Sequence, residues 1–321
     1  MDALAKYLNA FKNLKRGVTK YGKAPHKVVM LLSVLRAARN KLITENQIFI
    51  TPELVFHFKT NWNVLVTTSH VCNFALPFWH LRGEKFWQLI PKPGFEATLL
   101  LKESVASLGE LNAAVEYAKL NDDLFALMLD EKSNLMLQQF LLDEYFPGTK
   151  NIYKQTPYKQ ADLFDDLEGK ILNEDAATYR AEIKELLAQN NEEEIFLRGS
   201  VFKREIPKIY NNTCCISGMK IDATINVSMI DACHIIPFSE SYNDTVTNGI
   251  ALCPNLHRAF DRGLIAIDNN YKVVISKTFK EGESNYSIHR FEGKEILLPR
   301  MKDYFPLKEN FDWHQMKIFK S

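Results

Sequence analysis

The sequence lacks the features that mark several common classes of protein. Its longest apolar run, in residues 28–35, is interrupted by Ser33 and is far shorter than the roughly 18 residues that suggest a membrane span. Five cysteines, an odd number, do not suit a disulfide framework. Thirteen glycines and twelve prolines are too few for a low-complexity chain. Residues 1–6 show no secretion signal, so we expect a cytoplasmic, membrane-free protein with reduced thiols.

The formal net charge of +1 hides an uneven distribution along the 321 residues. Residues 1–105 contain 15 Lys and Arg against 6 Asp and Glu, a net charge of +9. The corresponding counts are 8 against 19 in residues 106–194 and 17 against 14 in residues 195–321, giving −11 and +3. The basic N-terminal part predicts contact with a polyanion, and the acidic middle predicts a face toward solvent or another basic surface. A solvated basic face without a ligand is the alternative.

The length favours two domains, and the fold class we expect is α+β. Residues 1–148 are expected to form a mainly helical DNA-recognition domain, with a helix over residues 4–14 and a buried helix that begins at Pro25. Two aromatic runs, 78–82 and 86–90, flank Gly83 and predict a β-hairpin. Residues 110–146 have helical periodicity, which ends at Pro147-Gly148.

Residues 149–194 are expected to be an acidic linker, because residues 148–172 have little periodicity and residues 174–194 predict an exposed charged helix. Residues 195–321 are the expected C-terminal domain. Residues 227–237 have strand character around His234 and stop at Pro237, and Asn248-Gly249 is a turn signal before a second apolar run. Residues 253–263 then predict a short helix.

Two side chains of that short helix are spaced to hold a cation. His257 and Asp261 are four residues apart, so the imidazole and the carboxylate share one helix face. This donor pair suits a divalent ion such as Mg²⁺, Mn²⁺, Ni²⁺ or Zn²⁺. The alternative is a surface carboxylate that pairs with Arg258 or Arg262.

Residues 200–270 resemble the HNH endonucleases, in the subgroup found in restriction enzymes. The resemblance is carried by Cys215-Ile216-Ser217-Gly218, His234-Ile235-Ile236-Pro237, Asn248-Gly249 and His257-Arg258-Ala259-Phe260-Asp261-Arg262-Gly263. It implies a ββα-metal finger with one divalent metal ion, Mg²⁺, Mn²⁺ or similar. In such a finger His234 would take a proton from water, His257 and Asp261 would hold the ion, and Asn248 would fix the loop that carries His234.

The sequence departs from the commonest HNH pattern at one position. Many HNH sites have an Asp or His ligand directly before the general base, whereas here that position is Cys233. On a strand, Asp231 and Cys233 share the face opposite His234, so Asp231 could supply the missing oxygen directly or through water. A hard cation favours Asp231 over Cys233. The remaining cysteines could suggest a structural zinc, but without a Cys-x-x-Cys pair we expect them to be buried small side chains.

Residues 20–90 resemble the sulfur-binding domain that is fused to HNH nucleases in phosphorothioation-dependent restriction enzymes. The resemblance is carried by residues 21–27, residues 77–82 and Phe86-Trp87, although Lys27 stands where an arginine is expected at least as often. An apolar cup favours sulfur over oxygen, because sulfur accepts hydrogen bonds poorly. The candidate residues are Pro77, Phe78 and Phe74 for the cup, His26, Lys27 and Arg82 for phosphate oxygens, and His80 or Arg82 for base edges.

Together the two resemblances predict a restriction endonuclease that recognises phosphorothioate-modified double-stranded DNA and hydrolyses phosphodiester bonds. A homodimer that nicks both strands is expected. One alternative is an HNH restriction nuclease that reads an unmodified sequence or a modified base. Another is a DNA-binding regulator with a structural finger, against which the intact His234 argues.

Overall fold

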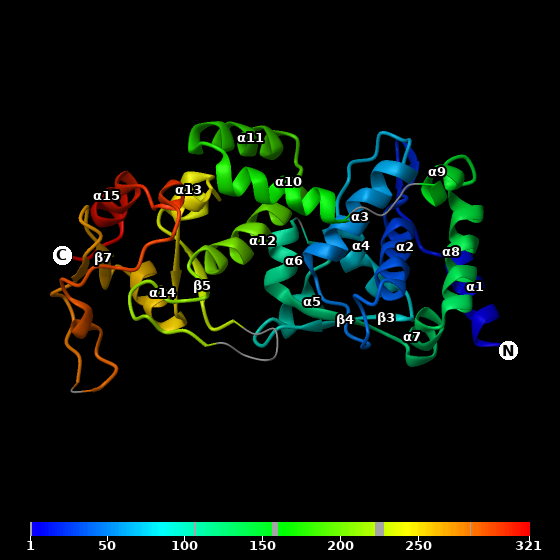
Figure 1. The fold of residues 1–321 in the computed structure, drawn as a ribbon. Helices are drawn as coiled ribbons and strands as arrows, with labels where there is room; N and C mark the ends of the chain where they lie inside the picture. Colours follow the sequence, from blue (N-terminus) through cyan, green and yellow to red (C-terminus); the bar gives the residue numbers. More distant parts are fainter. Residues whose placement is uncertain (1, 106, 156–159, 222–227, 283) are drawn as a thin grey trace. The chain divides into compact units, whose positions relative to one another are not determined.

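The structure, a computed structural model, describes residues 2–105, 107–155, 160–221, 228–282 and 284–321, with only the backbone described at 160–163. The chain divides into two compact units. The first is Met1–Gln160 with Asn190–Leu197, and the second is Ala161–Gln189 with Arg198–Ser321. Helices dominate, and the strands of the described residues form small antiparallel two-stranded sheets, which confirms the α+β class (Figure 1).

The first unit is built around one central helix. Its helices are α1 (Ala3–Lys12), α2 (His26–Arg39), α3 (Pro52–Leu65), α4 (Ala75–His80), α5 (Glu96–Leu101), α6 (Leu108–Ala114), α7 (Asp122–Leu129), α8 (Glu131–Tyr145) and α9 (Lys150–Gln155), and its strands are β1 (Val18–Thr19), β2 (Gly22–Lys23), β3 (Trp87–Pro91) and β4 (Val115–Leu120). Residues 28–38 of α2 are all buried, because α3, α4, α7 and α8 pack around it (Figure 1). The buried helix predicted to begin at Pro25 is confirmed, with Pro25 as its N-cap.

The predicted β-hairpin around Gly83 is wrong. The first aromatic run lies in α4 and the 3₁₀ turn η1 (Leu81–Gly83), and only the second run is a strand, β3. Phe78 and Trp79 are adjacent and both fully buried, which a strand with one buried face cannot achieve but a helix surrounded by protein can. Pro77 lies in the first turn of α4, where its missing N–H is tolerated.

The continuous helix predicted over residues 110–146 is also wrong. Strand β4 interrupts it and pairs antiparallel with β3, with Trp87 opposite Leu120 and Ile90 opposite Tyr117. The backbone N–H and C=O groups of β3 need partners, and this pairing supplies them. Tertiary pairing therefore overrides a helical pattern of apolar residues in this segment.

The second unit contains the predicted order of strand, loop, strand and helix. Its elements are α10 (Gln160–Asn173), α11 (Ala176–Ala188), α12 (Glu192–Ile209, which begins in the first unit), β5 (Asp231–His234), α13 (Phe238–Ser241), η2 (Val246–Asn248), β6 (Gly249–Leu252), α14 (Pro254–Asp261), β7 (Ile265–Ile267), β8 (Val273–Ile275), η3 (Ile288–Phe291), η4 (Lys302–Tyr304) and α15 (Lys308–Lys317). The start of the predicted first strand, at residue 227, lies outside the described residues. Residues expected to be irregular, within 148–172, are largely helical.

Glycine at position 249 is explained by packing against α12 and not by a turn. Gly249 has φ −127°, an ordinary strand conformation, and lies in β6. A Cβ atom there would lie 2.3 Å from Cδ1 of Ile206 and 2.9 Å from Cε2 of Phe202. Only glycine therefore allows α12 to lie this close to the strand that follows Asn248. Among the described helices, none combines the length and the apolar character needed to span a membrane.

Candidate active site

One pocket of the second unit brings together three of the predicted site residues. Strands β5 and β6 pair antiparallel, with Asp231 opposite Leu252 and His234 opposite Gly249, and α14 packs against both (Figure 1). His234 is the last residue of β5, and α14 carries the other two. The pocket has a volume of about 240 Å³ and is lined by His234, Ile235, Pro237, Phe238, His257, Asp261, His314 and Ile318.

His234 is held in one orientation by contacts on two sides. Its ring stacks on Phe202 of α12, with a centroid distance of 3.9 Å and an interplanar angle of 10°. Its Nε2 lies 2.8 Å from Oδ1 of Asp244, a carboxylate that is almost completely buried. The side chain is still 22% exposed and lines the pocket. The imidazole is therefore fixed and accessible, as a general base requires.

His257 lies between two carboxylates, one at each ring nitrogen. Its Nδ1 is 3.1 Å from Oδ2 of Asp231, and its Nε2 is 3.4 Å from Oδ2 of Asp261. His257 and Asp261 line the pocket, whereas Asp231 does not. The predicted shared face of His257 and Asp261 is thus present, but Asp231 lies on the other side of the imidazole.

The donor set fits a divalent cation. The ligand atoms of Cys233, His257 and Asp261 lie within 4.8 Å of one another, and within the described residues they form the one group of three or more such side chains that could hold an ion. Sγ of Cys233 is 3.9 Å from Oδ1 of Asp261. Burial, and then the neighbouring Asp261, raise the pKa of the Cys233 thiol. The carboxylate is a donor that suits Mg²⁺ or Mn²⁺, and the imidazole is a donor that suits Ni²⁺ or Zn²⁺.

Asn248 is completely buried and does not line the pocket. Its Nδ2 donates to the carbonyl oxygens of Ile236, at 2.9 Å, and Asn243, at 3.0 Å, and its Oδ1 accepts from the backbone N–H of Ile236, at 3.0 Å. These bonds cross-link the segment that follows His234. Asn248 thus contacts the loop that follows His234 and does not line the pocket.

A histidine at the end of a two-stranded antiparallel sheet shares a pocket with a histidine and an aspartate of the next helix, which is the strand-strand-helix arrangement predicted for the finger. Residues 214–268 match the HNH endonuclease family, which confirms the resemblance of the finger. This part of the chain is an HNH endonuclease domain, a family that hydrolyses phosphodiester bonds.

The solved structures that are similar to this chain include the following two. One is described as "Modification dependent TagI restriction endonuclease", with 20% identity and a TM-score of 0.27 over 36% of this chain and 37% of that chain. The other is "Sulfur binding domain and SRA domain of ScoMcrA complexed with phosphorothioated DNA", with 19% identity and a TM-score of 0.34 over 44% of this chain and 42% of that chain. This chain thus spans less than half the length of either. No curated protein sequence matches.

In the first unit, the residues predicted to form an apolar cup lie in the core. Phe74 and Phe78 are fully buried and stack on each other at 5.6 Å, and Pro77 is buried beside them. Phe58 packs edge-on against Phe74, and Trp87 packs edge-on against Phe78. These contacts pack the buried face of α4 against α3 and β3.

The side chains predicted to contact phosphate mostly form hydrogen bonds or ion pairs within the first unit. Nε2 of His26 lies 2.9 Å from the carbonyl oxygen of Val71, and burial lowers the pKa of His26. The guanidinium of Arg82 donates to the carbonyl oxygens of Leu99, at 2.6 Å, and Lys102, at 2.5 Å. Arg82 therefore anchors the segment after α5.

Two further candidates differ in exposure. His80 is exposed, with Nε2 at 3.1 Å from Oγ of Ser104, and burial, followed by the charge of Lys27, lowers its pKa. Nζ of Lys27 lies 2.7 Å from Oε1 of Glu84, and both side chains are nearly buried. His80 is thus the better placed of the two to reach a ligand.

Lys27→Ala is expected to destabilise the first unit by about 1–3 kcal/mol, because it leaves the Glu84 carboxylate buried without its cation. Lys85→Ala, which removes an exposed lysine, is the matched control and should change stability by less than about 0.5 kcal/mol. Urea unfolding followed by tryptophan fluorescence measures both. Equal midpoints for the two variants would show that the pair contributes nothing.

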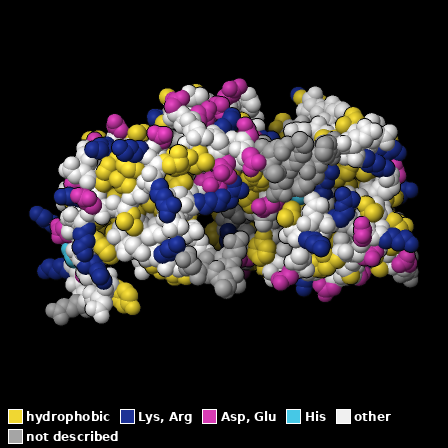
Figure 2. Space-filling model, viewed as in Figure 1, with side chains coloured by type: hydrophobic (Ala, Val, Ile, Leu, Met, Phe, Trp, Pro, Cys, Tyr) yellow, Lys and Arg dark blue, Asp and Glu magenta, His cyan; other side chains and the backbone are white. Residues whose placement is uncertain are grey.

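The exposed lysines of the β1–β2 ribbon are better placed to meet a polyanion than the predicted phosphate-contacting residues His26, Lys27 and Arg82. Lys20 and Lys23 are exposed, and so is Tyr21, whose ring packs edge-on against His70 at 5.6 Å. The sequence signal was the run of basic residues before Pro25, but exposure could not be assigned from it. In the second unit, by contrast, acidic side chains gather over α11 (Figure 2).

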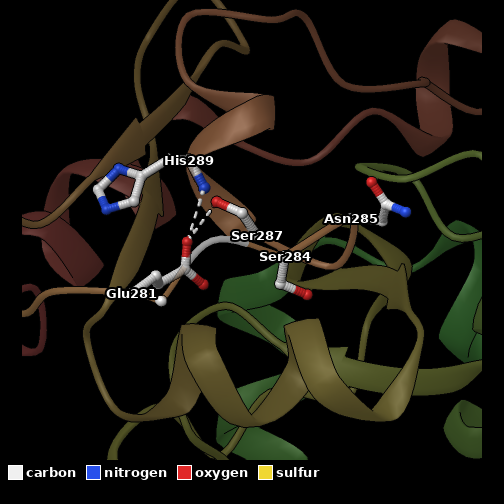
Figure 3. A pocket seen from close by; sticks show the side chains of 6 residues that line it. Glu281, Ser284, Asn285, Ser287 and His289 are labelled. Atoms are coloured by element: carbon white, nitrogen blue, oxygen red, sulfur yellow. Dashed lines mark hydrogen bonds between the residues drawn. The ribbon is translucent and has the colours of Figure 1, made fainter.

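A larger pocket, of about 660 Å³, lies on a polar loop and is not a catalytic candidate. Glu281 accepts hydrogen bonds from Oγ of Ser287, at 2.5 Å, and from the backbone N–H of His289, at 3.3 Å (Figure 3). This carboxylate therefore caps η3. The ring of His289 stacks on Phe279, which accounts for its position.

Proposed function

We propose that this nuclease is a DNA restriction endonuclease that recognises phosphorothioate-modified duplexes and cleaves them at the pocket between β5 and α14. The observation that carries the nuclease part is the shared pocket, into which His234 projects from the strand and His257 and Asp261 from the helix. The two histidines of the pocket each lie beside a different carboxylate, His234 beside Asp244 and His257 beside Asp231. This difference allows His234 to accept a proton and His257 to bind a cation.

His234 is the proposed general base. It takes a proton from a water molecule that attacks the phosphorus in line, so that a new P–O bond forms and the bond to the departing 3′ oxygen breaks. Stacking on Phe202 and the contact with Asp244 hold the imidazole still during this transfer. Asn248 contributes by cross-linking residues 236–243, which follow the base in the chain.

His257 and Asp261 are the proposed ligands of one divalent ion, Mg²⁺, Mn²⁺ or similar. When bound, such an ion supplies a Lewis acid beside the phosphate. Asp231 faces the opposite nitrogen of His257, where it accepts a hydrogen bond from Nδ1–H and leaves the Nε2 lone pair on the side of Asp261. We therefore propose that Asp231 orients His257, in place of the role predicted from the sequence, in which Asp231 supplies an oxygen to the ion directly or through water.

Double-stranded DNA is the proposed substrate, because residues 1–105 carry a net charge of +9 and the β1–β2 ribbon presents exposed lysines. Cleavage of both strands requires two nuclease pockets, so a homodimer is part of the proposal. Sulfur selection rests on the resemblance of residues 21–27 and 77–82. In this proposal Phe74, Pro77 and Phe78 act from within the core and hold the exposed His80 at the surface of the unit.

The unmutated protein is expected to bind a phosphorothioate duplex more tightly than the same duplex without sulfur, measured by gel shift at one fixed salt concentration. An affinity ratio near one would contradict sulfur selection and favour the alternative of a nuclease that reads an unmodified sequence or a modified base. The nuclease proposal would survive that result, because cleavage depends on the pocket of the second unit.

Lys20→Ala with Lys23→Ala is expected to weaken binding to both duplexes, because each phosphate contact contributes through counterion release and carries no information about sulfur. The slope of log affinity against log salt should become shallower by about one for each lost contact. Lys41→Ala, another exposed lysine of the same unit, is the control. An unchanged slope in the double variant would place the DNA elsewhere.

A further inference from the structure

A buried carboxylate joins the proposed base to a helix far away in the sequence. Asp244 is only 1% exposed, and its two oxygens have different partners. Oδ1 lies 2.8 Å from Nε2 of His234, and Oδ2 accepts a hydrogen bond of 3.3 Å from the hydroxyl of Tyr179. Tyr179 belongs to α11, which lies in the same compact unit as the nuclease finger.

The contact with Asp244 determines which nitrogen of His234 can act. A carboxylate only accepts hydrogen bonds, so Nε2 must carry the proton that the contact needs. In the neutral ring the lone pair then lies on Nδ1, which is the nitrogen left to take a proton from water. Without a fixed acceptor at Nε2, both tautomers would be populated and part of the protein would present the wrong nitrogen.

Tyr179 is itself held firmly, so it can position Asp244. Its ring is fully buried, and the guanidinium of Arg198 lies 5.2 Å from the ring centroid. Arg198 also donates to Oε2 of Glu182, one turn further along α11, at 2.8 Å. Burial, together with the nearby carboxylate of Asp244, raises the pKa of Tyr179, so its hydroxyl keeps the proton that it donates.

We propose that Asp244 is a positioning residue that selects the reactive tautomer of His234, and that Tyr179 holds Asp244 in place. The α11 helix, which lies outside the strand-strand-helix finger, is then part of the catalytic apparatus. This inference rests on the proposed role of His234 as the base. If Asp244 and Tyr179 were only structural, their variants would lose stability without a specific loss of turnover. This difference distinguishes a positioning role from a structural one.

The test compares Asp244→Asn and Tyr179→Phe with Tyr210→Phe in the full chain. Tyr210 is the matched control, a buried tyrosine of the same unit whose hydroxyl has no hydrogen-bond partner among the described residues. We expect Asp244→Asn to lower kcat by about 10²–10⁴-fold, as loss of base function does. Tyr179→Phe removes one hydrogen bond and should lower kcat about two- to tenfold. KM and Mn²⁺ affinity should stay unchanged in both.

A second readout does not depend on turnover. In protein with ¹⁵N-labelled histidine, the ring nitrogens of His234 should show the Nε2–H tautomer, and Asp244→Asn should produce a mixture of tautomers. The Nδ1–H tautomer in the unmutated protein would overturn the proposal. This measurement, with Tyr179→Phe, keeps the proposal testable even where Asp244→Asn fails to fold.

Failure of this inference and failure of the proposed function give different results. If His234→Ala abolishes cleavage while Asp244→Asn leaves kcat unchanged, His234 remains the base and the positioning role is wrong. If His234→Ala cleaves normally, the proposed function itself is wrong. A parallel loss of kcat and thermal stability in Tyr210→Phe, equal to that in Tyr179→Phe, would show that the effect is general to buried tyrosines.

Discussion

His234→Ala is expected to lower the rate of DNA cleavage by about 10²–10⁴-fold while DNA binding and metal binding stay intact. The reason is that the imidazole acts on water, and the proposed DNA contacts lie in the first unit. Single-turnover cleavage at saturating Mn²⁺ measures the rate, and gel shift measures binding. The ring of His234 lines the pocket and Asp244 lies at its Nε2, so alanine removes the positioned imidazole.

His289→Ala is the matched control for this change, because His289 is an exposed histidine of the same unit that lies outside the pocket. It should cleave like the unmutated protein. A His234→Ala variant with full activity would remove this histidine from the mechanism. A variant that loses DNA binding together with cleavage would show that His234 contributes to affinity.

His257→Ala is expected to abolish both Mn²⁺ binding and cleavage, because it removes the imidazole from the proposed metal site. Asp261→Asn should weaken both by a smaller amount, because the amide oxygen of asparagine can still bind the ion. Asp231→Asn should weaken metal affinity by about 10–100-fold, the effect that is usual for a residue that orients a ligand. Calorimetric titration with Mn²⁺ measures affinity in the absence of DNA, so the result does not depend on turnover.

Asp303→Asn, at an exposed carboxylate far along the chain from these ligands, is the control for the loss of negative charge. The order of the losses in Mn²⁺ affinity indicates which side chain binds the ion. A greater loss of metal affinity in Asp231→Asn than in Asp261→Asn would indicate that Asp231 is itself a ligand, one of the possibilities that the sequence left open. Unchanged affinity in His257→Ala would place the ion away from α14. Cys233→Ser, which keeps the size of the side chain, tests whether sulfur contributes.

The finger was predictable because its information is local. The strand before Pro237 and the Pro-initiated helix that ends shortly before Gly263 each follow from short-range preferences. Gly263 has φ +69°, and a Cβ atom there would lie 2.0 Å from the carbonyl oxygen of Ile318, so this glycine satisfies both a local and a tertiary requirement. The spacing of His257 and Asp261 needs only the geometry of one helix.

The wrong predictions in the first unit came from sequence patterns that fit more than one local structure. Tertiary contacts decide which of these structures forms. Aromatic residues at 78–79 and 86–87 suit a strand or a buried helix equally well, and the choice depends on what surrounds them. Strand β4 forms because β3 needs a hydrogen-bonded partner, a requirement that residues 115–120 do not reveal by themselves. The burial of Phe74 and Phe78, and the pairing of Lys27 with Glu84, likewise depend on neighbours that are distant in sequence.

By itself the sequence determined the order of the finger's elements, the spacing of its histidines and the basic character of residues 1–105, because each depends on residue type and short separation. Only the tertiary structure decided what lies at each ring nitrogen. Asp244 reaches His234 across a loop, Asp231 reaches His257 across from β5 to α14, and Tyr179 reaches Asp244 from a separate helix. Side-chain directions across such separations depend on packing, which no local pattern encodes.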